Sequence, residues 1–146
     1  MFLVLKQIMY LKKILILFVA ILFTSQLNAN TPRSTGKYKN WESFSIETDK
    51  GKVCFAQTIP KKRSPAAVSR GQSKLFVTFR PSENIKDEIS LTSGHDYKSS
   101  TVTASSGKNN FNLFSQNNFA WLLDEKEEQS FIKLMKRATN LIVKAR

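Results

Sequence analysis

Apolar and polar residues alternate with a period of two through much of the chain, which predicts short β-strands. The two clearest runs are residues 52–59 and 75–80, where Phe55 and its neighbours two positions away share one side of a strand. Pro81 lacks a backbone N–H donor and ends the second run. We expect these two runs to be the central strands, joined by the long polar connection of residues 60–74.

Weaker alternation predicts further strands on both sides of this pair. They cover residues 41–48, 88–93, 100–104 and 110–114, and an apolar block follows at residues 119–123. The first of them is expected to pair back onto residues 52–59 through a turn in which Gly51 supplies the positive φ. The pattern as a whole predicts an antiparallel meander.

The period changes to that of a helix near the C-terminus. Residues 124–138 begin with Asp124 as a cap and Glu127 three positions later, which is the capping-box spacing. An apolar stripe is expected to lie across the sheet; it consists of Phe131, Leu134, Met135 and Ala138. Residues 141–145 then begin another strand. We therefore predict a mainly β (α+β) fold, a small antiparallel meander or sandwich with one C-terminal helix packed on the sheet.

The N-terminus has the plan of a secretory signal. Lysines and no acids precede an apolar decamer at residues 14–23, and a polar stretch follows it. A membrane-spanning helix needs about 20 apolar residues, twice the length of this run. We predict cleavage after Ala29 and a periplasmic or secreted product; an uncleaved anchor is the alternative, and translation could start at Met1 or at Met9.

Length and composition fit one domain after the signal. The chain has 146 residues, 41% of them hydrophobic and eleven of them Phe, which is enough for a packed core. Residues 30–40 contain Pro32 and Gly36 among polar residues and are expected to be a flexible lead-in. Residues 41–146 are expected to form the single β-rich domain.

The net charge of +12 suggests anionic partners. Removal of residues 1–29 takes away three lysines and no acids, which leaves 20 basic against 11 acidic residues, or +9. Outside the cytoplasm the anionic partners are envelope components or a host surface, and no specific nucleic acid is expected. Most of the cations are lysines, however, and scattered lysines more often solvate a surface than form a site.

The densest positive charge lies in the connection between the two central strands. Its cations have no neighbouring acid and are candidates for binding phosphate or sulfate groups; they are Lys61, Lys62, Arg63, Arg70 and Lys74. The connection lacks the glycine-rich spacing of a nucleotide cradle, and no aromatic residues interleave the charges as they do on single-strand binding surfaces. A solvated loop is an equal alternative.

Candidate chemistry is sparse. Cys54 has no second cysteine to pair with, so it is either a small buried core residue or a site of intermolecular disulfide formation. The single histidine, His95, lies in a turn-like sequence, and no pattern places it beside Cys54 as an activating base. One His and one Cys are too few ligands for a closed zinc site. We expect no enzyme activity, metal or cofactor, and the oligomeric state stays open.

The ordered motifs KVCFA, LFVTFRP, the Gly94/Tyr97 turn, FNLF, FAW with Asp124, KLMKRA and LIVK resemble the invasion-associated locus B family of alphaproteobacteria. The resemblance covers residues 41–146 and is closest to the shorter, single-domain members. It implies an exported, β-rich protein associated with host-cell invasion and without an established catalytic activity. Because the matching residues are mainly apolar, Gly and Pro, they imply a fold rather than an active site.

The resemblance also implies a departure at the C-terminus. Similar chains continue after LIVKAR with a turn and a final strand, so this chain is expected to be a truncated copy with an open hydrogen-bonding edge at residues 141–145. The leading functional expectation is an exported, non-enzymatic envelope or surface protein. The alternative is a binder of anionic ligands, such as lipopolysaccharide, acidic lipid or nucleic acid, through the basic connection.

Overall fold

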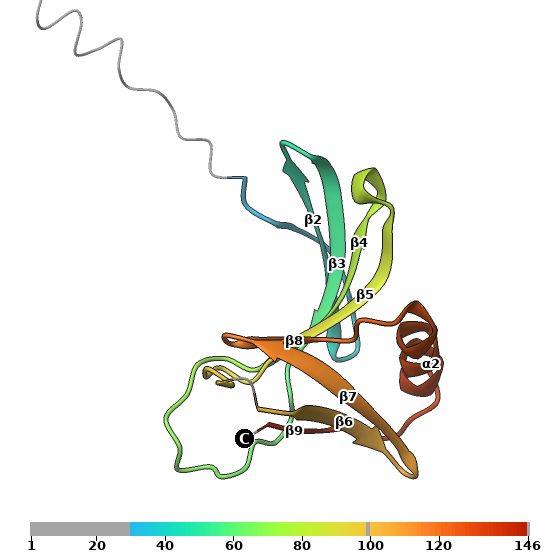
Figure 1. The fold of residues 1–146 in the computed structure, drawn as a ribbon. Helices are drawn as coiled ribbons and strands as arrows, with labels where there is room; N and C mark the ends of the chain where they lie inside the picture. Colours follow the sequence, from blue (N-terminus) through green and yellow to red (C-terminus); the bar gives the residue numbers. More distant parts are fainter. Residues whose placement is uncertain (1–29, 99, 146) are drawn as a thin grey trace, which may run out of the picture.

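The computed structural model describes residues 30–98 and 100–145, and in these residues it contains one sheet and one α-helix (Figure 1). The elements are β1 (Arg33–Tyr38), β2 (Trp41–Thr48), β3 (Gly51–Thr58), β4 (Lys74–Arg80), the 3-10 turn η1 (Pro81–Glu83), β5 (Ile85–Thr92), β6 (Val102–Ser106), β7 (Asn109–Gln116), β8 (Phe119–Trp121), α2 (Glu125–Met135) and β9 (Ile142–Lys144). The sheet is antiparallel in the order β1-β2-β3-β4-β5-β8-β7-β6-β9. The predicted mainly β fold with one C-terminal helix is confirmed.

The two central strands pair as the alternation predicts. β3 and β4 are antiparallel neighbours, although residues 59–73 separate them in the sequence. β2 and β3 form a hairpin that Gly51 makes possible, since its φ of 109° lies in a region that side chains disfavour. Pro81 begins η1 directly after β4, which confirms its role in ending that strand.

The prediction of a flexible lead-in at residues 30–40 is wrong, because most of this segment forms β1 on the edge of the sheet. Cross-strand side-chain bonds stabilise it: the Ser34 hydroxyl donates to Oε1 of Glu42 at 2.8 Å. Gly36 lies beneath the ring of Tyr38, so close that a Cβ on Gly36 would be 2.8 Å from the ring. A polar strand can therefore pair here without burying apolar side chains.

The core occupies only one part of the sheet. Ten hydrophobic residues are buried in the described structure: Leu75, Ile89, Leu91, Tyr97, Val102, Ala104, Leu113, Ala120, Leu122 and Phe131. None of them belongs to β1, β2 or β3. We call residues 33–58, which form these three strands, the wing, and residues 89–98 with 100–145 the body. β4 and the start of β5 join the two parts, and the wing stands above the body in Figure 1.

Helix α2 confirms the predicted cap and much of the predicted stripe. Oδ1 of Asp124 accepts a hydrogen bond from the N–H of Glu127 at 3.0 Å. Phe131 is fully buried and meets Phe111 edge to face, with ring centroids 5.0 Å apart. β8 pairs with β5 only near Ser90, so the start of β5 has no strand neighbour on that side. The helix runs beside this part of β5 instead.

The end of the described chain forms a strand as expected. β9 pairs with β6 and is the last strand in the sheet order, so its other edge has no strand partner among the described residues. Ile142 and Val143 are exposed there. The predicted signal segment, residues 1–29, lies outside the described residues, and among the residues that are described no helix is long and apolar enough to cross a membrane.

Candidate functional site

The two faces of the sheet differ in what covers them. Residues that pair directly across neighbouring strands point to the same face, so the pairs Phe44↔Phe55 and Gln57↔Phe76 belong to one face. We call it the outer face. The opposite, inner face carries the core residues of the body, and α2 adds Phe131 to them.

Five aromatic side chains from four strands form a continuous row on the outer face. The ring centroids are 5.1 Å apart for Phe44 and Phe55, 6.2 Å for Phe55 and Phe76, 6.3 Å for Phe76 and Phe119, and 5.8 Å for Phe119 and Trp121. We call these five residues the aromatic row. All of them are partly exposed, and none is part of the buried core.

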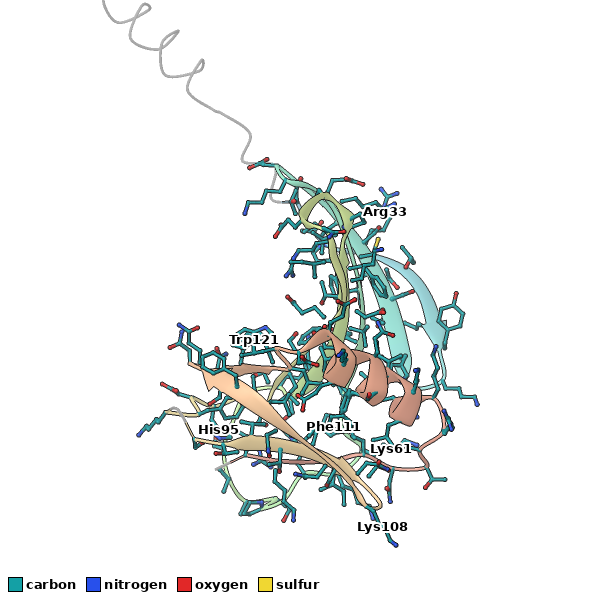
Figure 2. The ribbon with its side chains drawn as sticks, turned by 45° about the vertical axis from the view of Figure 1, so that its right-hand side comes forward. Arg33, Lys61, His95, Lys108, Phe111 and Trp121 are labelled. Carbon is teal, nitrogen blue, oxygen red and sulfur yellow. The ribbon has the colours of Figure 1, made fainter. Side chains whose placement is uncertain are left out.

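Further apolar side chains extend the row at both ends. Ile46 and Val53 face each other on β2 and β3 in the wing. At the other end Phe114 on β7 lies opposite Trp121 and is 52% exposed. In Figure 2 Arg33 marks the upper part of the wing, and Trp121 lies where the wing meets the body. The apolar outer face thus spans both parts of the molecule.

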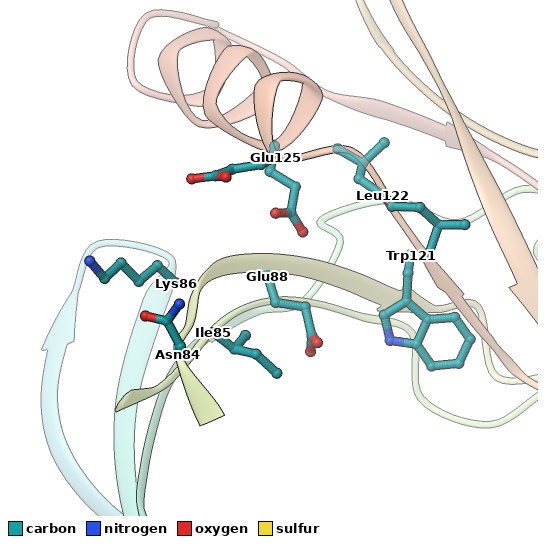
Figure 3. Close-up of a pocket in the computed structure, with 9 residues that line it drawn as sticks. Asn84, Ile85, Lys86, Glu88, Trp121, Leu122 and Glu125 are labelled. Atoms are coloured by element: carbon teal, nitrogen blue, oxygen red, sulfur yellow. The ribbon is translucent and has the colours of Figure 1, made fainter. Parts of the chain in front are cut away.

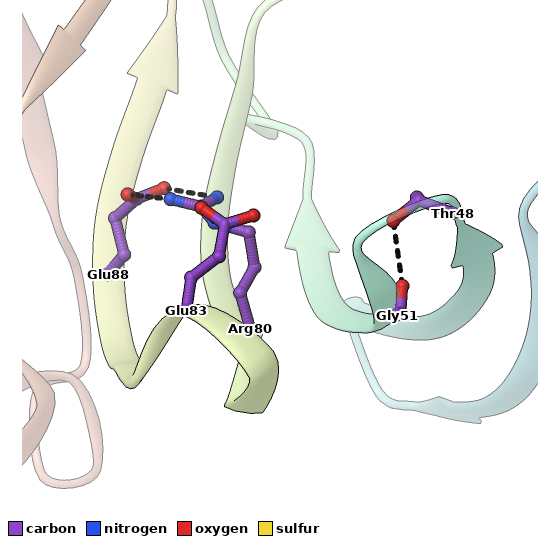
Figure 4. Close-up of polar contacts among 5 residues, drawn as sticks. All are labelled: Thr48, Gly51, Arg80, Glu83 and Glu88. Carbon is purple, nitrogen blue, oxygen red and sulfur yellow. Dashed lines mark hydrogen bonds and ion pairs between the residues drawn. The ribbon is translucent and has the colours of Figure 1, made fainter.

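Paired charges border the aromatic row. The guanidinium of Arg80 makes two hydrogen bonds to the carboxylate of Glu88, and its Nε lies 3.6 Å from Glu83 (Figure 4). On the first two strands Nζ of Lys37 lies 3.6 Å from Oε1 of Glu42. The cations that border the row at these two places are therefore neutralised, although the chain as a whole is strongly basic.

A pocket of about 410 Å³ opens beside the Trp121 end of the row (Figure 3). Its lining comes from the start of β5, the end of β8 and the start of α2: Asn84, Ile85, Lys86, Glu88, Trp121, Leu122, Leu123, Glu125 and Glu128. Apolar walls, three carboxylates and the ammonium of Lys86 meet there.

Glu128 is the buried acid of this pocket. Oε1 of Glu128 accepts a hydrogen bond from the N–H of Ile89 at 3.1 Å, which ties α2 to β5. Burial removes water from the carboxyl and raises its pKa above the ordinary value, and the nearby carboxylates of Glu88, Asp87 and Glu125 act in the same direction. The bond from Ile89 opposes the shift without reversing it.

The predicted anion-binding cations lie mostly together. The connection from β3 to β4 is exposed over residues 59–69 and carries Lys61, Lys62 and Arg63, with the partly buried Arg70 near its end. We call residues 59–73 the basic loop. Lys74 lies outside it as the first residue of β4, where its side chain is partly buried on the outer face.

Both arginines of the basic loop bond to the backbone of the loop itself. Nη1 of Arg63 donates to the carbonyl of Gly71 at 3.0 Å. Nη2 of Arg70 donates to the carbonyls of Ser64 and Pro65 at 3.3 and 3.5 Å. Each guanidinium has five donors, so each keeps some for a ligand, but both also hold the loop in shape.

A contact between two glycines fixes the end of the basic loop to the body. The N–H of Gly71 donates to the carbonyl of Gly94 at 2.8 Å, and the Ser73 hydroxyl donates to the carbonyl of Ser93 at 3.2 Å. A Cβ on Gly94 would lie 2.2 Å from the oxygen of Gly71. Only glycine at position 94 permits this approach.

Cys54 and His95 occupy different parts of the molecule. Cys54 is a free thiol on the inner face of the wing, opposite Ser45, and it is partly exposed rather than buried in the core, which corrects the core-residue alternative. The ring of His95 meets Tyr97 edge to face at 5.1 Å in the body. Among the described residues no group of three or more His, Cys, Asp or Glu side chains is placed to hold a metal ion.

Comparison with known proteins adds no relative. No protein-family model matches this chain, and neither curated proteins nor solved structures give a significant match. The aromatic row was missed from the sequence, although the alternation had already placed its members on strand faces. Strand register was the missing information, because it joins residues as far apart as Phe44 and Trp121.

Proposed function

We propose that this chain is an exported protein of the bacterial envelope or cell surface that acts by contact rather than by catalysis. Two sequence features support export to the envelope or cell surface: the signal-like pattern of residues 1–29 and the resemblance of residues 41–146 to the invasion-associated locus B family. The single observation that carries the contact function is the aromatic row on the outer face.

The extent of the row is that of an interaction surface. It crosses the sheet from β2 to β8, four strand spacings of about 4.8 Å or roughly 19 Å in all. Contiguous exposed apolar patches larger than a few hundred Å² are rare on monomeric proteins and mark contact sites. Aromatic residues are also the residues that interfaces favour most.

The orientation of the rings favours a protein surface as the partner. Phe44 and Phe55 stack with planes 15° apart, and Phe119 and Trp121 stack with planes 26° apart. The faces of these four rings are therefore turned toward each other, while Phe76 between the two pairs lies edge-on to Phe55, with planes 64° apart. A site for nucleotide bases needs open ring faces on which the bases can stack, so the row suits a packed apolar surface better.

Site-directed photocrosslinking in cells tests this function. A photoreactive phenylalanine analogue at Phe114 places the probe on the outer face, and the same analogue at Phe79 is the control, because Phe79 is 39% exposed on the inner face. We expect discrete crosslinked products from position 114 only. Equal products from both positions, or none from either, would contradict a contact function for the outer face.

Export is tested in the same cells. N-terminal sequencing of the protein from the periplasmic or secreted fraction is expected to find a start at or near Asn30, since the apolar run at residues 14–23 is too short to span a bilayer. Recovery of only the full-length chain in carbonate-washed membranes would contradict export as a cleaved product.

Anion binding by the basic loop is the second candidate function, supported by the attachment of the loop at Gly71 and Gly94. Serine at both Lys61 and Lys62 removes two exposed cations without touching the internal bonds of the loop, and serine at Lys50 and Lys52, exposed in the wing, is a control with the same charge change. Only the loop variant should lose affinity for anionic vesicles at low salt. Equal losses would indicate attraction by net charge alone.

A further inference from the structure

We propose that a second copy of this chain covers the aromatic row, so that two outer faces pack against each other. This inference rests on the proposed contact function and identifies the partner. It is drawn from the polarity of the two wing faces, from the charge around the row and from its extent.

The apolar face of the wing is one that no other part of the described structure covers. On β2 and β3 the inner face carries small or polar side chains such as Ser45 and Ala56, except for Trp41 at the start of β2, which packs against the core of the body. The outer face of the same strands carries Phe44, Val53 and Phe55. An antiparallel sheet normally packs its apolar face on a second layer and exposes the polar one. In the body that layer is α2 with the curled sheet, whereas the outer face of the wing has no such layer.

The charge distribution favours a like copy over an anionic partner. From residue 30 onward the chain carries 20 basic and 11 acidic residues, so two copies repel each other over most of their surfaces. Beside the aromatic row the cations of Arg80 and Lys37 are paired with carboxylates of the same chain. Lys74, two residues from Phe76 on the outer face, has no carboxylate partner among the described residues. Two outer faces therefore meet with the repulsion of one unpaired lysine from each copy, while anionic partners are drawn to the basic loop.

The available area is that of a small dimer interface. From β2 to β7 the outer face spans five strand spacings, about 24 Å, and the eight residues of β2 or β3 extend about 26 Å, whereas β8 contributes only three residues. The footprint is therefore at most roughly 600 Å² before the relief of the side chains is added, which corresponds to a weaker dimer than the about 800 Å² per partner of a standard interface. Because both copies use the same patch, the contact closes with two-fold symmetry and adds no further copies.

Sedimentation velocity of the exported protein over a range of concentrations tests the proposal directly. We expect the mass to rise from one chain to two, at lower protein concentration in high salt than in low salt, because salt screens the repulsion between the two basic chains and does not weaken the apolar contact. Trp121 is the optical probe in a Trp41→Phe variant, since the chain contains two tryptophans. Its emission should shift to shorter wavelength as the dimer forms and removes water from the row.

Two matched variants identify the face. Phe114→Glu places a charge on the outer face, and Phe79→Glu makes the same change on the inner face at a side chain that is also exposed. We expect the first to weaken dimerisation by at least about tenfold and the second to leave it unchanged. Ile142→Lys on the outermost strand β9 should also leave it unchanged, because that edge is not the contact.

Several results would overturn the second copy as the partner. They are a single-chain mass up to about 1 mM, the range of the weakest complexes, equal effects of the two Phe variants, or dissociation by Ile142→Lys. A monomer that still gives photocrosslinks to another protein from position 114 would leave the contact function standing and exclude the second copy alone. A monomer without such crosslinks would contradict both.

Discussion

The wing and the body are parts of one continuous sheet, yet they bury its apolar side in opposite ways. In the body the inner face holds residues such as Ile89 and Val102, both without exposed surface, and Phe131 of α2 packs with them. In the wing no residue of β1, β2 or β3 is buried, and the large apolar side chains lie on the outer face, apart from Tyr38 and Trp41 where β1 and β2 meet. The stability of the wing therefore depends on its backbone ladder and on ring contacts between strands.

The apolar side changes faces within one strand. Leu75 at the start of β4 points to the inner face and is 7% exposed, while the next residue, Phe76, points to the outer face and joins the aromatic row. A strand that serves both parts is apolar on both faces. The comparison shows that alternation assigns residues to faces, but that only packing decides which face is covered.

The largest expected difference between the two parts comes from removing one ring in each. Phe131→Ala empties a fully buried site in the body and should lower the free energy of unfolding by about 3–5 kcal/mol. Phe55→Ala removes two ring contacts in the wing and should lower it by about 1–2 kcal/mol. Denaturant unfolding measures both changes.

Hydrogen exchange shows which part of the molecule each substitution destabilises. Phe131→Ala should speed exchange throughout the body, while Phe55→Ala should speed it mainly in β2 and β3. Equal losses of stability with equal spread would show that the wing and the body unfold as one unit and that the division between them has no energetic meaning.

A smaller loss is expected where the basic loop, which leads from the wing into the body, meets the β5 to β6 turn. Gly94→Ala should cost about 2–3 kcal/mol, because the residue has a φ of 78° and its Cβ would collide with the backbone of Gly71. Gly107→Ala is the control: its φ is 57°, but no atom lies within 4 Å of the added Cβ. The melting temperatures of the two variants separate the effect of the Gly71–Gly94 contact from the effect of backbone strain. An equal decrease in melting temperature for both variants would mean that the contact contributes nothing to stability.

Much of the fold could be predicted because its determinants are local. Gly51 fixes the β2 to β3 hairpin, and Asp124 begins α2 through a bond to a residue three positions away. β1 could not be predicted in this way, since its polar side chains gain their partners only when Glu42 and the rest of β2 lie beside them. The polar, turn-like composition of residues 30–40 therefore did not indicate that β1 lies there.

The two candidate sites differ in the same way, because one depends on local sequence and the other on contacts between distant strands. The basic loop is contiguous, so its cations could be named from the sequence, but the backbone acceptors of Arg63 and Arg70 depend on how the loop folds. The aromatic row needs the register of five neighbouring strands to bring Phe44 and Trp121 onto one surface. Composition gave eleven phenylalanines and no indication of which would remain exposed.

The smallest expected effect concerns the acid that ties α2 to the start of β5, where the body meets the strands shared with the wing. Burial raises the pKa of Glu128 above its ordinary value of 4.5, so the folded protein holds this proton more tightly than the unfolded chain does. Stability from this group is therefore full below pH 4.5 and is lost as the pH rises through the raised pKa. Glu128→Gln removes that dependence, and its amide oxygen can still accept the bond from Ile89.

Unfolding free energies measured from pH 3 to pH 8 test this sign, and we expect Glu128→Gln to gain on the natural protein as the pH rises above 4.5. Glu127→Gln is the control, because Glu127 is the adjacent acid on α2 and is exposed. Glu128→Ala removes the same pH dependence but should be about 1–3 kcal/mol less stable than Glu128→Gln at every pH, since the N–H of Ile89 loses its acceptor. If Glu128→Gln lost stability at pH 7 relative to the natural protein, the charged carboxylate itself would be what joins α2 to β5, and burial would not be the dominant influence on its pKa.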